Sequence, residues 1–129
     1  MSSGSVDLGQ NISLGDNSLS FLARSVGISA TTLLVPSGSG MYEIKFYGVV
    51  QTAATSGSLT VNLEWTDPNK LQSKAFTLVL DLGTVGSWGS NSLVIEATQA
   101  THILIQASLV SLVGLGLNYD LYAYAKRIN

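Results

Sequence analysis

Residues 41–66, MYEIKFYGVVQTAATSGSLTVNLEWT, contain two strand-like patterns separated by a turn. In the first pattern, Tyr42, Ile44, Phe46, Gly48 and Val50 alternate with Glu43, Lys45, Tyr47 and Val49. In the second, Leu59, Val61, Leu63 and Trp65 alternate with polar residues, and TSGS at 55–58 supplies the turn. Because successive side chains of a β-strand point to opposite faces, a period of two predicts strands with one apolar face.

The same period recurs on both sides of this stretch. Further strands are predicted around residues 19–23, 30–35, 76–80, 93–97, 103–109 and 117–125. Turn signals such as PSGSG at 36–40 and DPNK at 67–70 separate them, and no helix of ten or more residues is indicated. About eight short strands of this kind predict an all-β, antiparallel sandwich. We therefore expect an N-terminal arm, residues 1–18, and one jelly-roll-like β-sandwich domain, residues 19–129.

Composition excludes several classes of protein. The chain has 129 residues, of which 46% are hydrophobic and 11% charged, with a net charge of −2 and no cysteine. This hydrophobicity argues against a disordered chain, and the acidic balance argues against a nucleic-acid partner. Without cysteine, disulfides, thiol nucleophiles and thiolate metal sites are excluded.

The chain is also not expected to have a membrane partner. Its longest apolar run, residues 103–117, is shorter than the roughly 20 residues of a spanning helix and is interrupted by Gln106 and Ser108. The first residues lack the basic start and apolar run of a signal peptide. We therefore expect a protein that is made in the cytoplasm and not exported by a recognisable signal.

Charge is absent from one long stretch, between Glu96 and Asp120, where the single histidine counts as neutral. In residues 104–117 both faces are apolar, so a second cover besides the protein's own core is expected. A second copy of the chain is the favoured cover, and a hairpin tucked into its own domain is the alternative. The predicted oligomer interface comprises Leu104, Leu109, Leu112, Val113, Leu115, Leu117, Tyr122 and Tyr124. The last two form an aromatic stripe, which suits an interface.

The N-terminal arm is polar but carries scattered apolar residues. Val6, Leu8, Ile12 and Leu14 are predicted to dock the arm onto another surface. Simple terminal disorder is the alternative interpretation.

Residues that could carry chemistry do not assemble into a reactive site. His102 is the only histidine, and no serine stands in a G-x-S-x-G sequence. Glu43 and Glu64 could meet across adjacent strands, where cross-strand ion pairing is the favoured role. Asp67 and its neighbours are explained by an Asx-turn rather than a calcium site. We predict no catalytic residue, no cofactor and no metal, and hence no enzyme.

Trp88 stands apart among the aromatic residues. It lies in a predicted loop, residues 83–91, among glycines and serines. It is interpreted either as a cap on the end of the sandwich or as a ligand residue that stacks on a sugar or plugs a neighbour.

Three segments resemble a known family: GSGMYEIKFYGVV (38–50), TAATSGSLTVNLEWTD (52–67) and the closing pattern Tyr119-x-Leu121-x-Ala123. Together they are similar to the small β-sandwich structural proteins of tailed-bacteriophage virions. The resemblance implies a non-enzymatic virion protein, usually trimeric, with no catalytic residue to transfer. It covers about residues 30–125.

The family includes capsid decoration proteins and tail fibre or spike domains. No coiled-coil, collagen-like or baseplate segment precedes the domain, which favours a trimeric decoration (cement) protein that binds and stabilises the capsid shell. Its expected partners are the major capsid protein or other virion proteins. The alternative is a trimeric tail fibre or spike module that binds a receptor or a host surface glycan.

Overall fold

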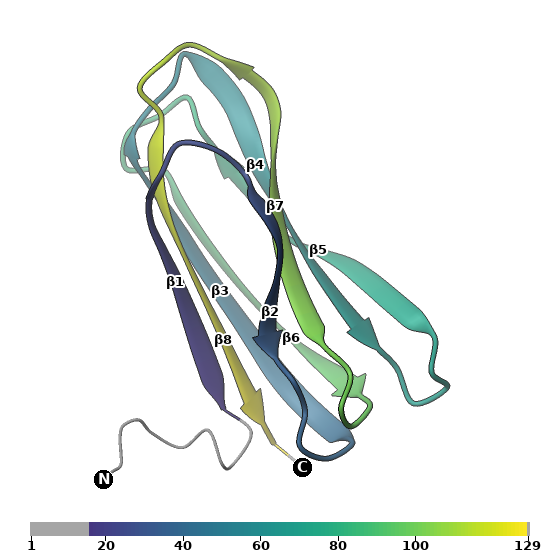
Figure 1. Ribbon diagram of the computed structural model, residues 1–129. Helices are drawn as coiled ribbons and strands as arrows, with labels where there is room; N and C mark the ends of the chain where they lie inside the picture. The colour runs from purple at the N-terminus through teal and green to yellow at the C-terminus, as the bar shows by residue number, and fades with distance from the viewer. Residues whose placement is uncertain (1–15, 129) are drawn as a thin grey trace, which may run out of the picture.

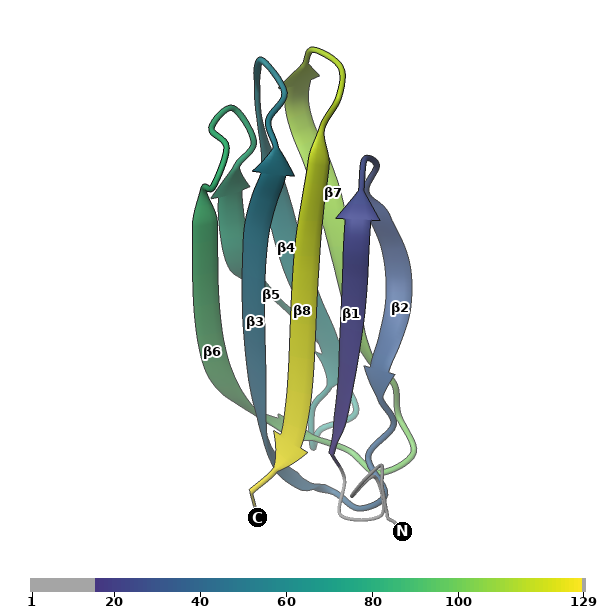
Figure 2. The same cartoon turned by 90° about the vertical axis from the view of Figure 1, so that its left-hand side faces the viewer.

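The computed structural model describes residues 16–128, which form eight antiparallel strands. The strands are β1 (Asn17–Arg24), β2 (Ile28–Leu34), β3 (Gly40–Thr52), β4 (Ser56–Thr66), β5 (Gln72–Asp81), β6 (Trp88–Ala97), β7 (Ile103–Val113) and β8 (Asn118–Arg127). They build two four-stranded sheets of order β1-β8-β3-β6 (sheet A) and β2-β7-β4-β5 (sheet B). The sheets pack face to face (Figures 1 and 2). The predicted all-β jelly-roll sandwich is confirmed.

The core lies between the sheets and is built from the alternating apolar positions. Tyr42, Ile44, Leu59, Val61 and Leu63 are all fully buried. The two large buried tyrosines also satisfy their hydroxyl groups. Tyr42 donates a hydrogen bond to the Gly38 carbonyl over 2.7 Å, and Tyr119 donates one to the Val26 carbonyl over 2.6 Å.

The register of β5 departs from the simple alternation. Val61 of β4 pairs with Leu78, but the next residue, Asn62, pairs with Phe76, so Thr77 is an extra residue in the ladder. This β-bulge turns both Thr77 and Leu78 inward and leaves Phe76 77% exposed. Thr77 satisfies its hydroxyl group by donating to the Val61 carbonyl. The fifth strand is therefore present, but Phe76 does not belong to its buried set.

Two boundaries differ from the predicted ones. β1 begins at Asn17, so residues 17 and 18 belong to the sandwich rather than to the arm. β6 begins at Trp88, which the sequence placed in a loop. Trp88 therefore has a fixed register against Val49 of β3.

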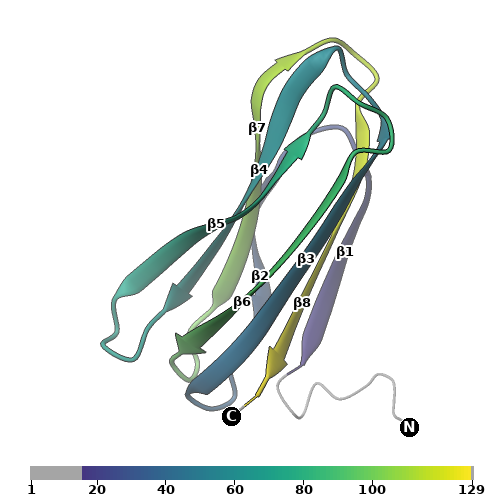
Figure 3. The same cartoon turned by 180° about the vertical axis from the view of Figure 1, so that it is seen from behind.

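The pairing suggested for Glu43 and Glu64 does not occur, because β3 and β4 belong to different sheets. Glu64 instead lies 3.3 Å from the amine of Lys74 on β5. The turn after β4 forms as predicted: the Asp67 carboxylate accepts hydrogen bonds from the backbone N–H groups of Asn69 and Leu71. In Figure 3 this turn projects beyond the rest of sheet B. Within residues 16–128 there is no helix long and apolar enough to cross a membrane.

Candidate functional site

The outer face of sheet A combines aromatic side chains with serines and a lysine. Because all its strands are antiparallel neighbours, the pairing places outward residues in rows that cross the sheet from β1 to β6. One row consists of Ser20, Tyr122, Tyr47 and Ser90. The next row, two residues along each strand, consists of Ser18, Tyr124, Lys45 and Ser92. A third row, on the other side of the first, holds Asp120, Val49 and Trp88.

Three of these aromatic residues form a continuous chain of rings. The ring centroid of Tyr47 lies 6.3 Å from that of Trp88 and 6.2 Å from that of Tyr122, with interplanar angles of 28° and 36°. Tyr47 is the central member, 41% exposed, and Trp88 is 65% exposed. We call this chain of three rings, Trp88, Tyr47 and Tyr122, the aromatic row, in which Tyr47 and Tyr122 share one cross-strand row and Trp88 comes from the neighbouring one. It spans β6, β3 and β8.

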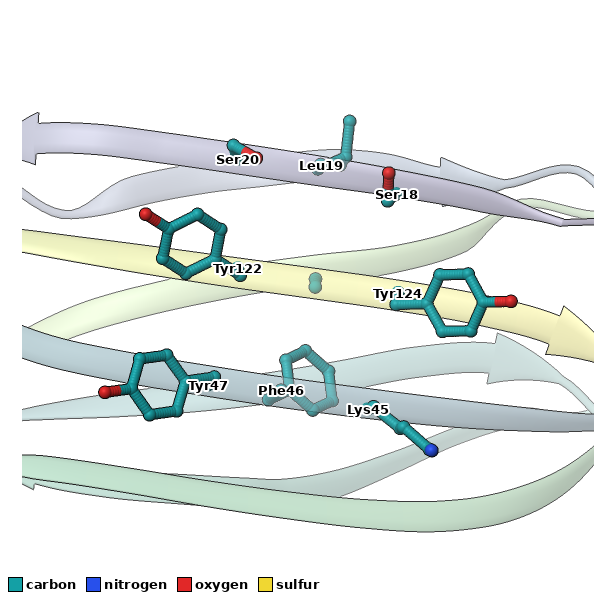
Figure 4. A pocket seen from close by; sticks show the side chains of 9 residues that line it. Ser18, Leu19, Ser20, Lys45, Phe46, Tyr47, Tyr122 and Tyr124 are labelled. Carbon is teal, nitrogen blue, oxygen red and sulfur yellow. The ribbon is translucent and has the colours of Figure 1, made fainter. Parts of the chain in front are cut away.

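A groove crosses sheet A beside the aromatic row. Its first hollow, of about 380 Å³, is lined by Ser18, Leu19, Ser20, Lys45, Phe46, Tyr47, Tyr122, Ala123 and Tyr124. A second hollow, of about 450 Å³, is lined by Lys45, Phe46, Ser90, Asn91 and Ser92. The two share Lys45 and Phe46, so together they extend from β1 to β6. Figure 4 shows why the first is open: Tyr122 and Tyr124 point in opposite directions along β8.

Two glycines on the inner side of sheet A allow close packing beneath the aromatic row. Gly48 of β3 pairs with Gly89 of β6, directly beside Tyr47 and Trp88. A Cβ atom at Gly89 would lie 2.9 Å from Cδ1 of Leu78, and one at Gly48 would lie 3.4 Å from Cδ2 of Leu80. The absence of side chains here lets the leucines of β5 approach sheet A closely from inside. The part of sheet A that carries Tyr47 and Trp88 is therefore closely packed against β5 on its inner side.

The polar groups of the groove are hydrogen-bond donors at neutral pH. Burial, followed by the nearby carboxylates of Asp16 and Glu43, raises the pKa of the Tyr124 hydroxyl. That hydroxyl therefore stays protonated. Lys45 is the one charged residue among those that line the two hollows.

The eight residues of the predicted interface do not form one surface. Leu117 is only 5% exposed and belongs to the protein's own core, and Leu109 packs against that core opposite Leu59. Leu104 is half-buried in sheet B. Tyr122 and Tyr124 lie on the outer face of sheet A. For Leu117 the prediction is wrong, because the chain enters β8 there and turns the side chain inward.

The remaining three predicted residues lie at one end of the sandwich. Leu112, Val113 and Leu115 are exposed, and Leu115 is 96% exposed between Gly114 and Gly116. The β1–β2 and β5–β6 loops lie toward the same end, the upper end in Figures 1 and 2, and carry the exposed Val26 and Val85. We call Val26, Val85, Leu112, Val113 and Leu115 the apical residues.

The docking residues of the arm and the candidates for chemistry lie outside these two surfaces or outside the described residues. Val6, Leu8, Ile12 and Leu14 lie outside the described residues, so their docking role stays a prediction. Nδ1 of His102 lies 2.8 Å from the Thr32 hydroxyl, and His102 directly precedes β7, whose other end carries Leu112 and Val113. Among residues 16–128 no three His, Asp or Glu side chains are grouped as metal ligands.

The sequence suggested Trp88 as a ligand residue and Tyr122 as an interface residue, but did not connect them. Tyr47, which joins them, was placed on the correct face of its strand without any role. Lys45 and the serines of β1 and β6 were also missed. Only the pairing of distant strands brings these residues together. The outward position of Tyr47 at the centre of its strand could have indicated a binding surface, because an exposed aromatic residue there is unusual.

The sequence matches no family model and no curated protein. Among solved structures, the fold is similar to PRD1 vertex protein P5, with 15% identity over 90% of this chain and 98% of that chain and a TM-score of 0.55. It is also similar to a capsid structure of Helicobacter pylori bacteriophage KHP30, with 16% identity over 86% and 85% and a TM-score of 0.52. The similarity to small β-sandwich proteins of phage virions is therefore confirmed at the level of the fold.

The same fold also serves other classes of protein. A xylan-binding CBM22-1 domain from Paenibacillus barcinonensis matches with 13% identity over 87% of this chain and 72% of that chain, at a TM-score of 0.50. At such identities the likeness concerns the fold alone, and function must be argued from the surface of this chain.

Proposed function

We propose that this chain is a non-enzymatic structural component of a bacteriophage virion, which trimerises and binds the capsid shell as a decoration protein. The observation that carries the proposal is the exposed aliphatic end of the sandwich, with Leu115 at its tip. The folds of the phage vertex and capsid proteins support the setting.

Assembly at the apical residues is supported by the exposure of their side chains. Leu115 and Val113 are exposed, and residues 97–119 contain no charged residue that would be desolvated in an interface. An aliphatic tip of this kind is stabilised when other copies cover it, most simply around a symmetry axis. Three copies around a threefold axis would bring the three Leu115 side chains together.

Shell binding would stabilise the capsid by mass action. A protein that binds only the assembled shell shifts the equilibrium towards assembly, by an amount that grows with occupancy. The predicted docking residues Val6, Leu8, Ile12 and Leu14 would contribute to this contact. Because β1 begins at Asn17, deletion of residues 2–15 removes them without shortening a strand.

Sedimentation velocity at micromolar concentration tests the assembly. We expect the mass of a trimer for the wild type and of a monomer for the double variant Val113→Ser, Leu115→Ser. Phe76→Ser is the matched control, because it removes another strongly exposed apolar side chain, from sheet B, and should leave the trimer intact. A monomeric wild type would contradict the proposal.

Co-sedimentation with capsids and with tails of the phage that encodes the chain separates decoration from a tail fibre or spike role. Binding to capsids that weakens on deletion of residues 2–15 supports decoration and the docking role of the arm. Binding to tails alone would replace decoration by the fibre or spike alternative.

A further inference from the structure

The geometry points to a binding site for a linear oligosaccharide in the groove across the outer face of sheet A, with Tyr47 and Tyr122 of its lining as stacking residues and Trp88, whose ring adjoins that of Tyr47, extending this aromatic platform beside the groove. This inference does not depend on where in a virion the protein is located, nor on whether it trimerises.

The first argument is the shape of the site. The two hollows lie end to end and cross all four strands, so the groove is about 14 Å long, three inter-strand spacings. Its two ends lie at the edge strands β1 and β6. A groove of this form accepts a chain molecule that continues past the protein, rather than a compact ligand that a closed pocket would enclose.

The second argument is the arrangement of the rings. Tyr47 and Tyr122 lie side by side with their ring faces visible from outside the sheet (Figure 4), and their centroids are 6.2 Å apart. A pyranose ring presents C–H groups on its broad face and hydroxyl groups around its edge. The negative face of an aromatic ring attracts such C–H groups, and exposed rings lose little conformational entropy on binding. Successive rings of the row can therefore support successive sugar units.

The third argument is the polar border. Ser18 and Ser20 on β1 and Ser90 and Ser92 on β6 stand at the two ends of the rows and are exposed. Lys45 and the protonated Tyr124 hydroxyl lie between them. These groups donate and accept hydrogen bonds with sugar hydroxyls, which point sideways from a stacked pyranose. No aliphatic side chain is exposed along the two rows that flank the groove.

The size of the patch argues against a second protein as the occupant. The three rows cover roughly 14 by 14 Å, or about 200 Å². A stable protein interface buries about 800 Å² on each partner. The next row along the strands carries Glu43 and Lys126 beside the exposed Val94, and Asp120 stands in the third row. Charged side chains are therefore present at both edges of the patch along the strands. A small polar-rimmed aromatic platform fits a sugar chain better than a protein.

Binding can be tested on the isolated full-length protein. The probes are an array of linear oligosaccharides and bacterial surface polysaccharides, followed by calorimetric titration with the tetrasaccharide, disaccharide and monosaccharide of the best binder. We expect affinity to increase from the monosaccharide to the tetrasaccharide, because the groove accommodates several units.

Point variants identify the site. Tyr47→Ala and Trp88→Ala are each expected to weaken binding about tenfold or more. Tyr47→Phe, which keeps the ring, should remain within a few-fold of the wild type. Phe76→Ala removes an exposed ring from sheet B and should bind as the wild type does. Circular dichroism and thermal unfolding verify that each variant is folded.

Three results would overturn the inference. The first is a wild type that binds no oligosaccharide on the array. The second is binding that Tyr47→Ala and Trp88→Ala leave unchanged. The third is a loss of oligomer mass in Tyr47→Ala by sedimentation velocity, which would identify the aromatic row as a contact between protein chains. The proposed assembly role is tested by different variants, so the two proposals can fail separately.

Discussion

Tyr47 of β3 and Tyr122 of β8 stand directly opposite each other in the antiparallel register, with ring centroids 6.2 Å apart. The two residues are 75 positions apart in the sequence, and the pairing of β3 with β8 brings them together. Trp88 of β6 lies two residues along the strand from Ser90, the partner of Tyr47, and its ring contact with Tyr47 extends the cluster to a third strand. One face of one sheet thus combines a residue suggested for ligand binding with one suggested for assembly.

The contact between the two tyrosines should be measurable as a coupling energy. We expect a double-mutant cycle with Tyr47→Ala and Tyr122→Ala to give about 0.5–1.5 kcal/mol of favourable coupling in the free energy of unfolding. Urea denaturation of the four proteins measures it. A cycle of Tyr47 with Phe76, which lies on the other sheet, should show no coupling and serves as the control.

The bulge in β5 predicts opposite results for two apolar residues of the same strand. Leu80→Ala should reduce the free energy of unfolding by about 2–5 kcal/mol, because Leu80 is buried and a cavity remains. Phe76→Ser should change it by no more than about 0.5 kcal/mol, because its ring is already in solvent. Comparable losses from both substitutions would show that Phe76 is buried and that the bulge is absent.

The two glycines that flank Leu115 should differ in their tolerance of a side chain. Both have positive φ angles, 101° at Gly114 and 86° at Gly116. A Cβ at Gly114 would lie 2.7 Å from the backbone nitrogen of Thr55, whereas one at Gly116 would meet nothing within 4 Å. We expect Gly116→Ala to cost about 1 kcal/mol from backbone strain alone. Gly114→Ala should cost clearly more, and equal thermal unfolding midpoints would contradict this packing.

Tyr119 predicts a loss of stability at high pH. Burial raises the pKa of its hydroxyl to about 12, partly offset by the positive charge of Arg24. Since the folded state holds this proton more tightly than the unfolded chain, whose tyrosine pKa is about 10, the stabilisation is complete below pH 10 and disappears as pH rises through 12.

The variant Tyr119→Phe isolates this contribution. Near pH 7 it should be the less stable protein, because the Val26 carbonyl loses its donor. Above about pH 10 its disadvantage should shrink, since only the wild type must ionise a buried group. Unfolding free energies measured from pH 8 to 12 would reveal this convergence, and a constant difference across the range would argue against the shift.

Period-two alternation was sufficient to predict the strands and most of the core. It placed Tyr42, Ile44, Leu59 and Leu63 inside and Tyr47 outside, because the geometry of a single strand determines which side chains share a face. It was misled where local structure breaks the period. The bulge at Thr77 moves Phe76 outward. Leu117, in contrast, keeps the inward register of Tyr119 and Leu121, as the alternation predicted, and only the interface prediction fails there. The absence of charge in residues 97–119 indicated exposed apolar surface in this segment, but not at which end of the sandwich that surface lies.

The candidate sites depend on information that no single strand contains. An antiparallel sandwich, its strands and its apolar positions could be predicted from the amino-acid pattern, because these follow from local side-chain periodicity. The position of β8 between β1 and β3, and of β6 at the edge, becomes known only from the folded chain. That order brings Trp88, Tyr47 and Tyr122 together on the outer face of sheet A, whereas Leu115 lies in the loop between β7 and β8. Strand order is determined by long-range pairing and packing of the whole core, to which the alternation within each strand is insensitive.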